Sequence, residues 1–287
     1  MAGSNSTSLA NLIPQIIAEA TFVASERSIM RGLVKNYSIP MGSGGSIKVP
    51  IYPKVSAAAY TGSADTEITN STVSADSATL TLGTVAIRTM VSDLARNSAA
   101  SNIVADVGRL FGEAIARKID TDLTALFSSF STVIGNASTT ITPAAIFQAV
   151  ATLRSAGVPP SDLYCVLHPA IAYDLKSSLT TTGNNPFTAG AFGPNANEAM
   201  REGFVGMLSG VPVYETSNLA DTGTTGDYKC GLFHREALGL AMMGDIQIET
   251  QRRASFLGDD IVASCNYAVG ELYDGYGIQL FNDSSIL

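Results

Sequence analysis

The chain of 287 residues contains no tryptophan, only three cysteines and two histidines, and few charged side chains. Charged residues make up 15% of the sequence, against about 25% in a typical soluble domain, whereas hydrophobic residues make up 46%. Such a chain builds a large core and leaves little charge for its surface. We therefore expect much of that surface to face other subunits.

Positive charge is also scarce, because 17 Lys and Arg stand against 25 Asp and Glu, which gives a net charge of −8. Proteins that bind nucleic acid usually present a basic face, since phosphate neutralisation supplies most of their affinity. The balance argues against this class. No apolar run approaches the ~20 residues that cross a bilayer, and no basic residue precedes an apolar stretch at the N-terminus. We expect neither a membrane span nor a secretory signal.

The three cysteines, Cys165, Cys230 and Cys265, are far apart and odd in number. None belongs to a CxxC pair or to a spacing of metal ligands, so we expect free thiols in a reducing compartment. Nucleophilic catalysis needs a base near Cys or Ser, and only His168 and His234 are available. Cys165 and His168 are three residues apart, so on a strand they point to opposite faces. We expect a buried cysteine and a histidine at a strand end.

Three short motifs offer little chemistry. Asp259-Asp260 predicts a turn or a solvated corner, with a loose divalent-cation site as the alternative. Arg252-Arg253 predicts an intersubunit ion pair or a solvated strand end. The run at 42–45, Gly-Ser-Gly-Gly, lacks the Lys-Ser/Thr of a phosphate-binding loop and predicts a flexible joint. We expect no catalytic, cofactor-binding or metal-binding residue.

The N-terminal third predicts a helix followed by a long β excursion. Residues 9–33 place apolar side chains at helical spacing, with a start close to Asn11. Residues 46–91 alternate as two strands, in which Pro50 and Pro53 indicate an edge strand. At Gly83-Thr84 the alternation of apolar and polar residues shifts by one position, which predicts a β-bulge. Residues 56–76 between the limbs are small and polar, which fits either a surface loop or an arm completed by a neighbour.

The strongest periodic pattern covers residues 101–130 and predicts a helix of about 45 Å. Gly108 and Gly112 lie inside it, and their spacing of four would permit close approach by another backbone. The apolar positions, three or four residues apart, are Ile103, Val107, Leu110, Phe111, Ala114, Ile115, Ile119, Leu123, Leu126 and Phe130.

The remaining chain predicts an α/β segment and then a set of strands. A helix begins at Thr142-Pro143, a buried strand follows at 163–167, and a short helix runs to about Leu179. An exposed loop at 180–197 follows, then an amphipathic stretch from Glu198 to Leu208. The strands predicted after it are 211–214, 230–234, 246–250, 261–269 and 277–281.

This order of parts resembles the major capsid proteins of tailed bacteriophages, the Hong Kong 97-type (HK97-like) α+β fold. Local sequences similar to those of this family occur at 163–169 (Leu-Tyr-Cys-Val-Leu-His-Pro), at 204–214 (Phe-Val-Gly-Met-Leu-Ser-Gly-Val-Pro-Val-Tyr), at 231–237 and at 239–241. The resemblance implies five parts: an N-terminal arm (1–45), an extended β-hairpin loop (46–91), a peripheral domain with a spine helix (92–136), an axial domain (137–226) and a return to the peripheral domain (227–287).

The function that the resemblance implies is a structural shell protein. Copies would assemble as hexamers and pentamers into an icosahedral virion shell around double-stranded DNA, contacted only non-specifically, in the host cytoplasm. A portal and possible decoration protein are implied partners. Because the arm-like helix begins almost at Met1, we expect a separate scaffolding protein. Residues 56–87 contain no Lys or Arg, which leaves only Lys54 at the loop base, so we expect no covalent cross-linking.

Three other readings stay open at this point. An encapsulin-type compartment shell resembles the same architecture but encloses cargo enzymes. A cytosolic hydrolase would use Cys165 or a serine with His168. A β-rich adhesin or other tail component is the third.

Overall fold

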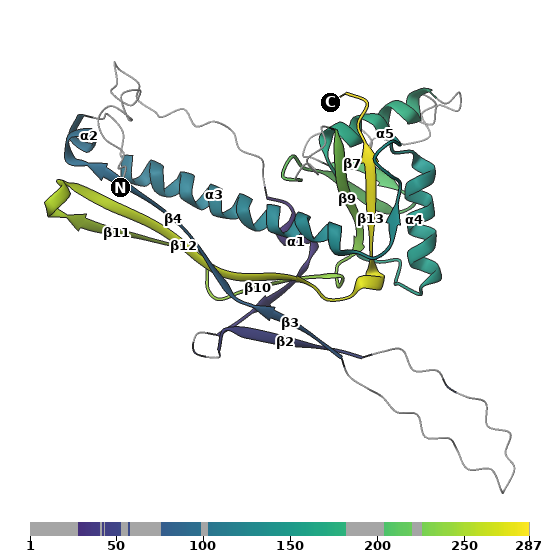
Figure 1. Cartoon of the computed structure of the whole chain (residues 1–287), viewed down its shortest axis with the longest axis horizontal. Helices are drawn as coiled ribbons and strands as arrows, with labels where there is room; N and C mark the ends of the chain where they lie inside the picture. Colours follow the sequence, from purple (N-terminus) through teal and green to yellow (C-terminus); the bar gives the residue numbers. More distant parts are fainter. Residues whose placement is uncertain are drawn as a thin grey trace, which may run out of the picture.

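The structure, a computed structural model, describes residues 28–40, 42, 44–52, 57, 76–98, 103–181, 204–219 and 226–286. A long helix, α3 (Ile103–Ala125), runs between two sheets of five and six strands, and a separate two-stranded hairpin projects from the first sheet (Figure 1). Among the described residues most strand pairs are antiparallel, three are parallel, and helices pack against both larger sheets. The expected α+β class is confirmed.

The centre of the five-stranded sheet is β12 (Gly258–Glu271), whose 14 residues pair along both edges. One edge carries β4 (Gly83–Ser92), and the other carries first β11 (Gln247–Arg253) and then β10 (Leu238–Met242). The outermost strand is β1 (Lys35–Ser38), which runs parallel to β10. The sequence pattern missed β1 and β10. The four residues of β1 show no alternation of apolar and polar types in the sequence, and every residue of β10 is apolar.

The hairpin consists of β2 (Ser46–Ile51) and β3 (Asp76–Thr81), paired in antiparallel register. Alternate residues of β2 are half-buried over a small second core with Leu80, Ala268 and Leu272. Pro50 lies on a strand with one paired edge, as its missing donor requires. The limbs of the predicted β excursion are therefore confirmed, while Pro53, Lys54 and residues 58–75 lie outside the described residues.

The predicted bulge at Gly83-Thr84 is wrong. The change of phase arises because the chain changes partner at Leu82, whose N–H donates to the Gly45 carbonyl at 2.8 Å. Before that residue β3 pairs with β2, and after it β4 pairs with β12. One nearly continuous strand thus belongs to two sheets, which shifts its alternation.

The predicted long helix is found as α3, with its last turn, Leu126–Ser129, tightened into a 3₁₀ turn. A short helix, α2 (Asp93–Ser98), precedes it, and another, α1 (Met30–Leu33), packs against it. The helix predicted from residue 9 lies outside the described residues up to residue 27. A Cβ placed on Gly108 would contact the Ile248 side chain, and one placed on Gly112 would contact no atom outside its own helix turn. Within the described part of the chain, no other backbone therefore approaches these glycines.

The six-stranded sheet has the order β5-β13-β9-β6-β8-β7. Thr142 caps α4 (Pro143–Ser155) as predicted, since its side chain accepts a hydrogen bond from the Ala145 N–H. The other helix of this region is α5 (Pro169–Thr181), and the loop predicted at 182–197 lies outside the described residues. The strands are β5 (Val133–Ile134), β6 (Leu163–Leu167), β7 (Phe204–Leu208), β8 (Val211–Glu215), β9 (Asp227–His234) and β13 (Gly277–Asp283).

The last segment, 227–287, divides between the two sheets. Its strands β9 and β13 pair with each other in the six-stranded sheet, where β9 also pairs with β6 and β13 with β5. The strands β10, β11 and β12 belong to the five-stranded sheet. One continuous core of buried residues runs through both regions, including Leu123, Phe127 and Phe233. The two sheets are therefore joined by packing as well as by the chain.

Candidate functional site

The cysteine and histidine of the α/β segment form a structural core. Cys165 is fully buried, and burial raises the pKa of its thiol. Burial also raises the pKa of Cys230 to about 12, although a hydrogen bond to the His168 backbone opposes the shift. A thiol of this kind stays protonated near pH 7, and the protonated form is a poor nucleophile.

His168 is fixed by its neighbours. Its ring stacks on Tyr228 with 3.7 Å between ring centroids, and its Nδ1 accepts a hydrogen bond from the Ala170 N–H at 3.3 Å. His234 is buried and accepts from the Glu236 N–H at 3.2 Å. Both rings serve packing and turn geometry, as the sequence predicted for His168.

The interpretation of Asp259-Asp260 as a solvated corner or cation site is wrong. Arg252-Arg253 ends β11, and Arg252 is exposed, as one of its two predicted alternatives, a solvated strand end, requires. Asp260 is buried and forms ion pairs with Arg88 Nε at 2.7 Å and Arg253 Nε at 3.1 Å. Carboxylates neutralised by guanidinium groups have no free charge for a metal ion. Over the described ranges, no three His, Cys, Asp or Glu side chains come together as metal ligands.

These residues belong to two ion-pair clusters that adjoin at Asp259-Asp260 and together hold four arginines and three aspartates; we call the two clusters the tip network. The Arg252 guanidinium donates twice to Asp93, once at 2.6 Å, and lies 3.5 Å from Asp259. Arg96 pairs with Asp259 and lies 3.7 Å from Asp93. The network joins α2, β4, β11 and β12 at one end of the molecule.

The tip network shifts the protonation of its members in the direction that ion pairing dictates. The hydrogen bond from Arg252 lowers the pKa of Asp93 below its usual value, and the same bond raises the pKa of Arg252. Sequence spacing did not reveal Arg88, Asp93 and Arg96 as partners, because they lie more than 150 residues from Asp259 and Asp260. Their exposed position also limits what each pair contributes to stability.

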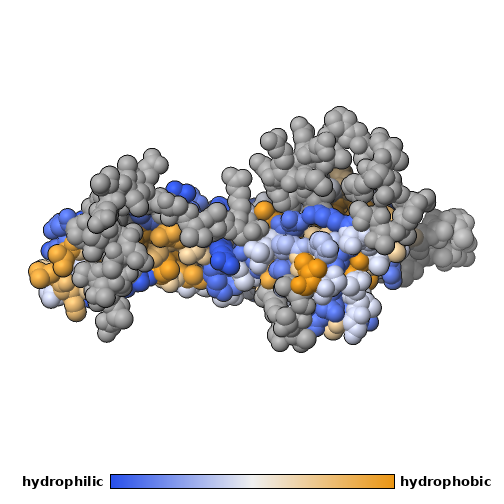
Figure 2. Space-filling model, turned by 90° about the horizontal axis from the view of Figure 1, so that it is seen from above, coloured by the Kyte–Doolittle hydropathy of each residue, from blue (hydrophilic) through white to orange (hydrophobic). Residues whose placement is uncertain are grey.

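An exposed apolar patch lies beside the tip network. We call Leu94, Phe256 and Leu257 the tip patch; their exposed fractions are 66%, 55% and 67%. The Asp93 N–H donates to the Leu257 carbonyl at 2.8 Å, which holds α2 against the turn between β11 and β12. In Figure 2 hydrophobic side chains gather at this end of the molecule. Sequence reasoning missed the patch, although an apolar pair between two strands at 256–257 is a visible signal.

A second apolar surface follows α3. Leu110 is 45% exposed on the helix. Ile248 on β11 is 46% exposed, and its side chain lies 3.8 Å from the position of a Cβ on Gly108 of the same helix. Every residue of β11 before Arg253 is exposed, although the strand is paired along one edge. Isolated exposed apolar residues are common, but a contiguous group marks an interaction surface.

A buried carboxylate joins three parts of the chain at the middle of α3. Asp120 is inaccessible to solvent; its Oδ1 accepts from Ser28 Oγ at 3.0 Å and from the Met30 N–H at 2.8 Å. Its Oδ2 accepts from Asn218 Nδ2 at 2.9 Å, and Arg117 Nε donates to Asn218 Oδ1 at 3.2 Å. The root of the N-terminal segment, the spine helix and the segment after β8 therefore meet on one side chain.

In the part of the chain that the structure describes, no helix has the length and apolar character needed to span a membrane. The features described above are exposed apolar residues and the buried or paired polar groups beside them. The tip patch, the α3 surface and the projecting hairpin lie on different parts of one subunit. This arrangement gives each copy several directions of contact.

Comparison with known proteins agrees with this geometry. The sequence matches the phage capsid protein family over residues 76–279. No curated protein matches it. Similar solved structures are the capsid of cyanophage P-SCSP1u (19% identity, 99% of this chain and 97% of that chain, TM-score 0.73) and a structure of Mycobacterium phage Che8 (20%, 93% and 96%, 0.74). The head structure of Helicobacter pylori bacteriophage KHP40 is also similar (12%, 99% and 99%, 0.75).

The structural matches cover nearly the whole chain at low identity, so they show a shared fold, and the expected Hong Kong 97-type architecture is confirmed. The family match covers most of the chain and does not favour a compartment shell or a hydrolase. The chain belongs to the phage capsid protein family, and it is a structural protein that associates with copies of itself in the virion capsid.

Proposed function

We propose that copies of this chain assemble through hexamers and pentamers into a closed icosahedral shell that encloses the double-stranded DNA genome of a tailed phage. The observation that carries the proposal is the family match over 76–279 in a chain that exposes large apolar residues, among them the three of the tip patch and Leu110 on α3. Association buries such surfaces and is driven by their removal from water. Identical subunits joined this way close into symmetric assemblies.

Each part of the subunit has a role in this proposal. Residues 1–45 form an arm, 46–91 reach over a neighbour, and 92–136 form the peripheral domain around the spine helix. Residues 137–226 form the axial domain at the capsomer centre, and 227–287 return to the peripheral domain. The pairing of β9 with β6, and of β13 with β9, adds one refinement, because these two strands of the last segment belong to the same sheet as the axial strands.

Packaged DNA would be held without specific contacts. Residues 1–100 carry 7 basic and 6 acidic side chains, so residues 101–287 carry 10 basic and 19 acidic side chains. That acidic body repels phosphate and limits sticking of the genome to the shell. As further partners in assembly in the host cytoplasm we propose a separate scaffolding protein, a portal and a decoration protein.

The test is to express the chain with and without candidate scaffolding protein and to examine the products by sedimentation and electron microscopy. We expect large regular particles from the unmodified chain. Phe256→Ser together with Leu257→Ser removes most of the tip patch and should lower the yield of closed particles at least tenfold. Ile286→Ser is the matched control, because Ile286 is 53% exposed but lies near the C-terminus, away from both surfaces.

A chain that stays monomeric at high concentration under every condition would overturn the proposal. Equal loss of particles in the Ile286→Ser control would remove the tip patch as the cause. Thermal melting of the variants at low concentration separates failed assembly from failed folding, since the substituted residues lie on the surface.

A further inference from the structure

The outer edge of β1 is an open strand edge. The Ile39 N–H donates to the Met242 carbonyl at 2.9 Å, so residues 35, 37 and 39 turn their backbone groups toward β10. The backbone N–H and C=O groups of Asn36 and Ser38 therefore point away from the sheet. In the described residues nothing pairs with them, and an unpaired edge of this kind is a template for another strand.

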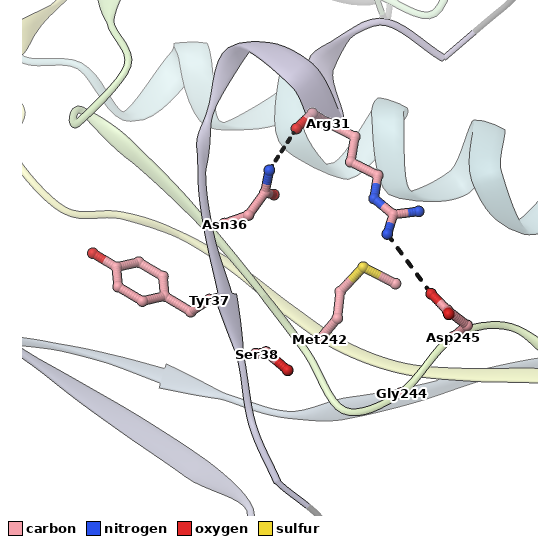
Figure 3. Close-up of a pocket in the computed structure, with 7 residues that line it drawn as sticks. All are labelled: Arg31, Asn36, Tyr37, Ser38, Met242, Gly244 and Asp245. Atoms are coloured by element: carbon pink, nitrogen blue, oxygen red, sulfur yellow. Dashed lines mark hydrogen bonds and ion pairs between the residues drawn. The ribbon is translucent and has the colours of Figure 1, made fainter.

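A cavity of about 340 Å³ opens beside this edge, between β1, α1 and the turn after β10. Figure 3 shows the Arg31 side chain extending over the cavity toward Asp245, with Asn36, Ser38 and Met242 below it. The Asn36 side chain donates to the Arg31 carbonyl at 2.9 Å, which fixes α1 over the start of β1. The wall of the cavity is thus built by side-chain contacts and lies against the open strand edge.

The chemistry of the cavity favours a carboxylate. The guanidinium of Arg31 has five donors, and its ion pair with Asp245 is long, 3.8 Å, with side chains 56% and 92% exposed. A pair so exposed is weak and screened by salt, so Arg31 keeps donors for another acceptor. Within the described structure the Ser38 hydroxyl makes no hydrogen bond, and Met242 supplies an apolar surface next to it.

We propose that the free edge of β1 and the adjoining cavity bind an extended acidic segment of a partner polypeptide by strand addition. The segment's backbone pairs with Asn36 and Ser38, and one Asp or Glu side chain, directed into the cavity, accepts hydrogen bonds from Arg31. Main-chain pairing supplies affinity, and the charged pocket supplies selectivity.

The small size of the site fits a partner that binds and dissociates, and does not fit a lasting contact with a second shell subunit. Two outward residues offer at most four main-chain hydrogen bonds, and a cavity of about 340 Å³ has room for no more than a few side chains. Lasting interfaces between subunits bury about 1,200–2,000 Å² and centre on apolar anchors, which this chain carries instead at the tip patch and along α3. A short polar contact fits a segment that binds and leaves during assembly.

The experiment selects a yeast-displayed library of random heptapeptides on the purified chain alone and then measures the enriched peptides on Ser38→Pro. Proline at 38 removes an outward N–H and leaves the bonds to β10 intact. We expect the enriched peptides to share an Asp or Glu at one position. For a synthetic enriched peptide, fluorescence anisotropy should show binding at least tenfold weaker to Ser38→Pro and about fivefold to twentyfold weaker to Arg31→Gln.

Lys48→Gln is the matched control, because it removes another exposed cation, on β2, and should leave the affinity unchanged. Should Ser38→Pro fail to fold, methylating alternate backbone nitrogens of the peptide tests the same pairing on the unmodified chain and should abolish binding. Enriched peptides that bind Ser38→Pro or Arg31→Gln as well as the unmodified chain would overturn the proposal. A peptide of this chain's residues 61–72 that outcompetes every selected peptide would also overturn it, because the occupant would then be a second copy.

Discussion

At the scale of single residues, close contacts around Phe127 show how the two sheets are held together. Its ring lies 5.4 Å from that of Phe233 and 6.4 Å from that of Phe130, all in the continuous core. Gly231 on β9 makes room for it, since a Cβ there would lie 2.6 Å from Phe127 Cδ1. Glycine at 231 is therefore required by packing.

We predict that Gly231→Ala destabilises the chain by about 1–3 kcal/mol, because the added methyl group forces Phe127 from its place. Gly112→Ala is the matched control: it lies in α3 with nothing within 4 Å of the added atom, and should stabilise the chain by about 1 kcal/mol. Urea unfolding of both variants measures the two shifts. A neutral result for Gly231→Ala would show that the core around Phe127 relaxes freely.

Sequence reasoning at this scale identified residue types correctly but missed their partners. The two carboxylates at 259–260 and the two guanidinium groups at 252–253 were visible as isolated pairs. Their neutralisation follows from the β11–β12 register, which places Arg252 opposite Asp259, and from β4 on the other edge. Without that register, an adjacent carboxylate pair is indistinguishable from a solvated turn.

At the scale of elements, the tip network ties α2 to the end of the β11–β12 hairpin. The pKa of Asp93 is lowered by its hydrogen bonds to Arg252, so the folded state prefers the ionised form more than the unfolded state does. A carboxylate of this kind stabilises the fold above its unfolded pKa of about 3.9, and that stabilisation is lost as the pH falls through the lower folded value.

We predict that Asp93→Asn lowers the melting temperature at pH 7 and that the difference from the unmodified chain shrinks as the pH falls below about 4. Melting curves between pH 2 and pH 7 measure it. Glu249→Gln serves as the control, because Glu249 is exposed on β11 and forms no ion pair in the described part of the structure. A difference for Asp93→Asn that persists undiminished at pH 2 would contradict the ionic origin of the effect.

The Asp120 joint makes a second prediction about elements. Asp120→Asn would place an amide group against Asn218 Nδ2, so that two donors face each other in a buried site. We expect a loss of about 1–3 kcal/mol in the free energy of unfolding. Adding Asn218→Asp to it restores one donor and one acceptor, and the new carboxylate also accepts from Arg117, so the double variant should regain at least half of the loss.

Asn218→Asp alone is the control, since it places two buried carboxylates together and should be less stable than the double variant. Chemical unfolding of the four proteins gives the coupling between the positions. Losses that simply add in the double variant would show that the two side chains do not interact.

Element positions were largely predictable where the hydrophobic period was long. The apolar spacing over 101–130 and the Thr142-Pro143 cap identified α3 and α4 because both signals are local. The exchange of partners at Leu82 and the edge position of β1 depend on strands more than 150 residues away. Local alternation carries no information about which sheet a strand joins.

At the scale of the whole molecule, the subunit distributes its apolar contact surfaces over separate places. Composition alone indicated a subunit of an assembly. The fraction of charged residues is lower than in a typical soluble domain, and a surface with so little charge suits contact with other subunits. Only part of the tip patch was predictable, from the apolar pair at 256–257, since Leu94 joins that pair only when α2 meets the β11–β12 turn.

We predict that assembled particles are held by non-covalent contacts alone. Residues 56–87 contain no lysine and therefore no side-chain amine for a cross-link. The lysines nearest in sequence before this range are Lys48 and Lys54. Particles boiled in detergent should therefore migrate as a single band of monomer in denaturing electrophoresis. A ladder of higher bands would contradict the prediction, and substituting Lys48 and Lys54 by Gln would then identify the amine involved.

The strand that passes from β3 into β4 gives the subunit a mechanical property. A load on the hairpin travels along β4 and so acts perpendicular to the hydrogen bonds of its ten registered pairs with β12, from Gly83–Tyr267 to Ser92–Gly258. Loading in this direction strains all ten pairs together and does not peel them one by one. When outward pressure pulls on the hairpin of one subunit, the force is distributed over all the pairs between β4 and β12. The subunit therefore resists stretching until these pairs break together.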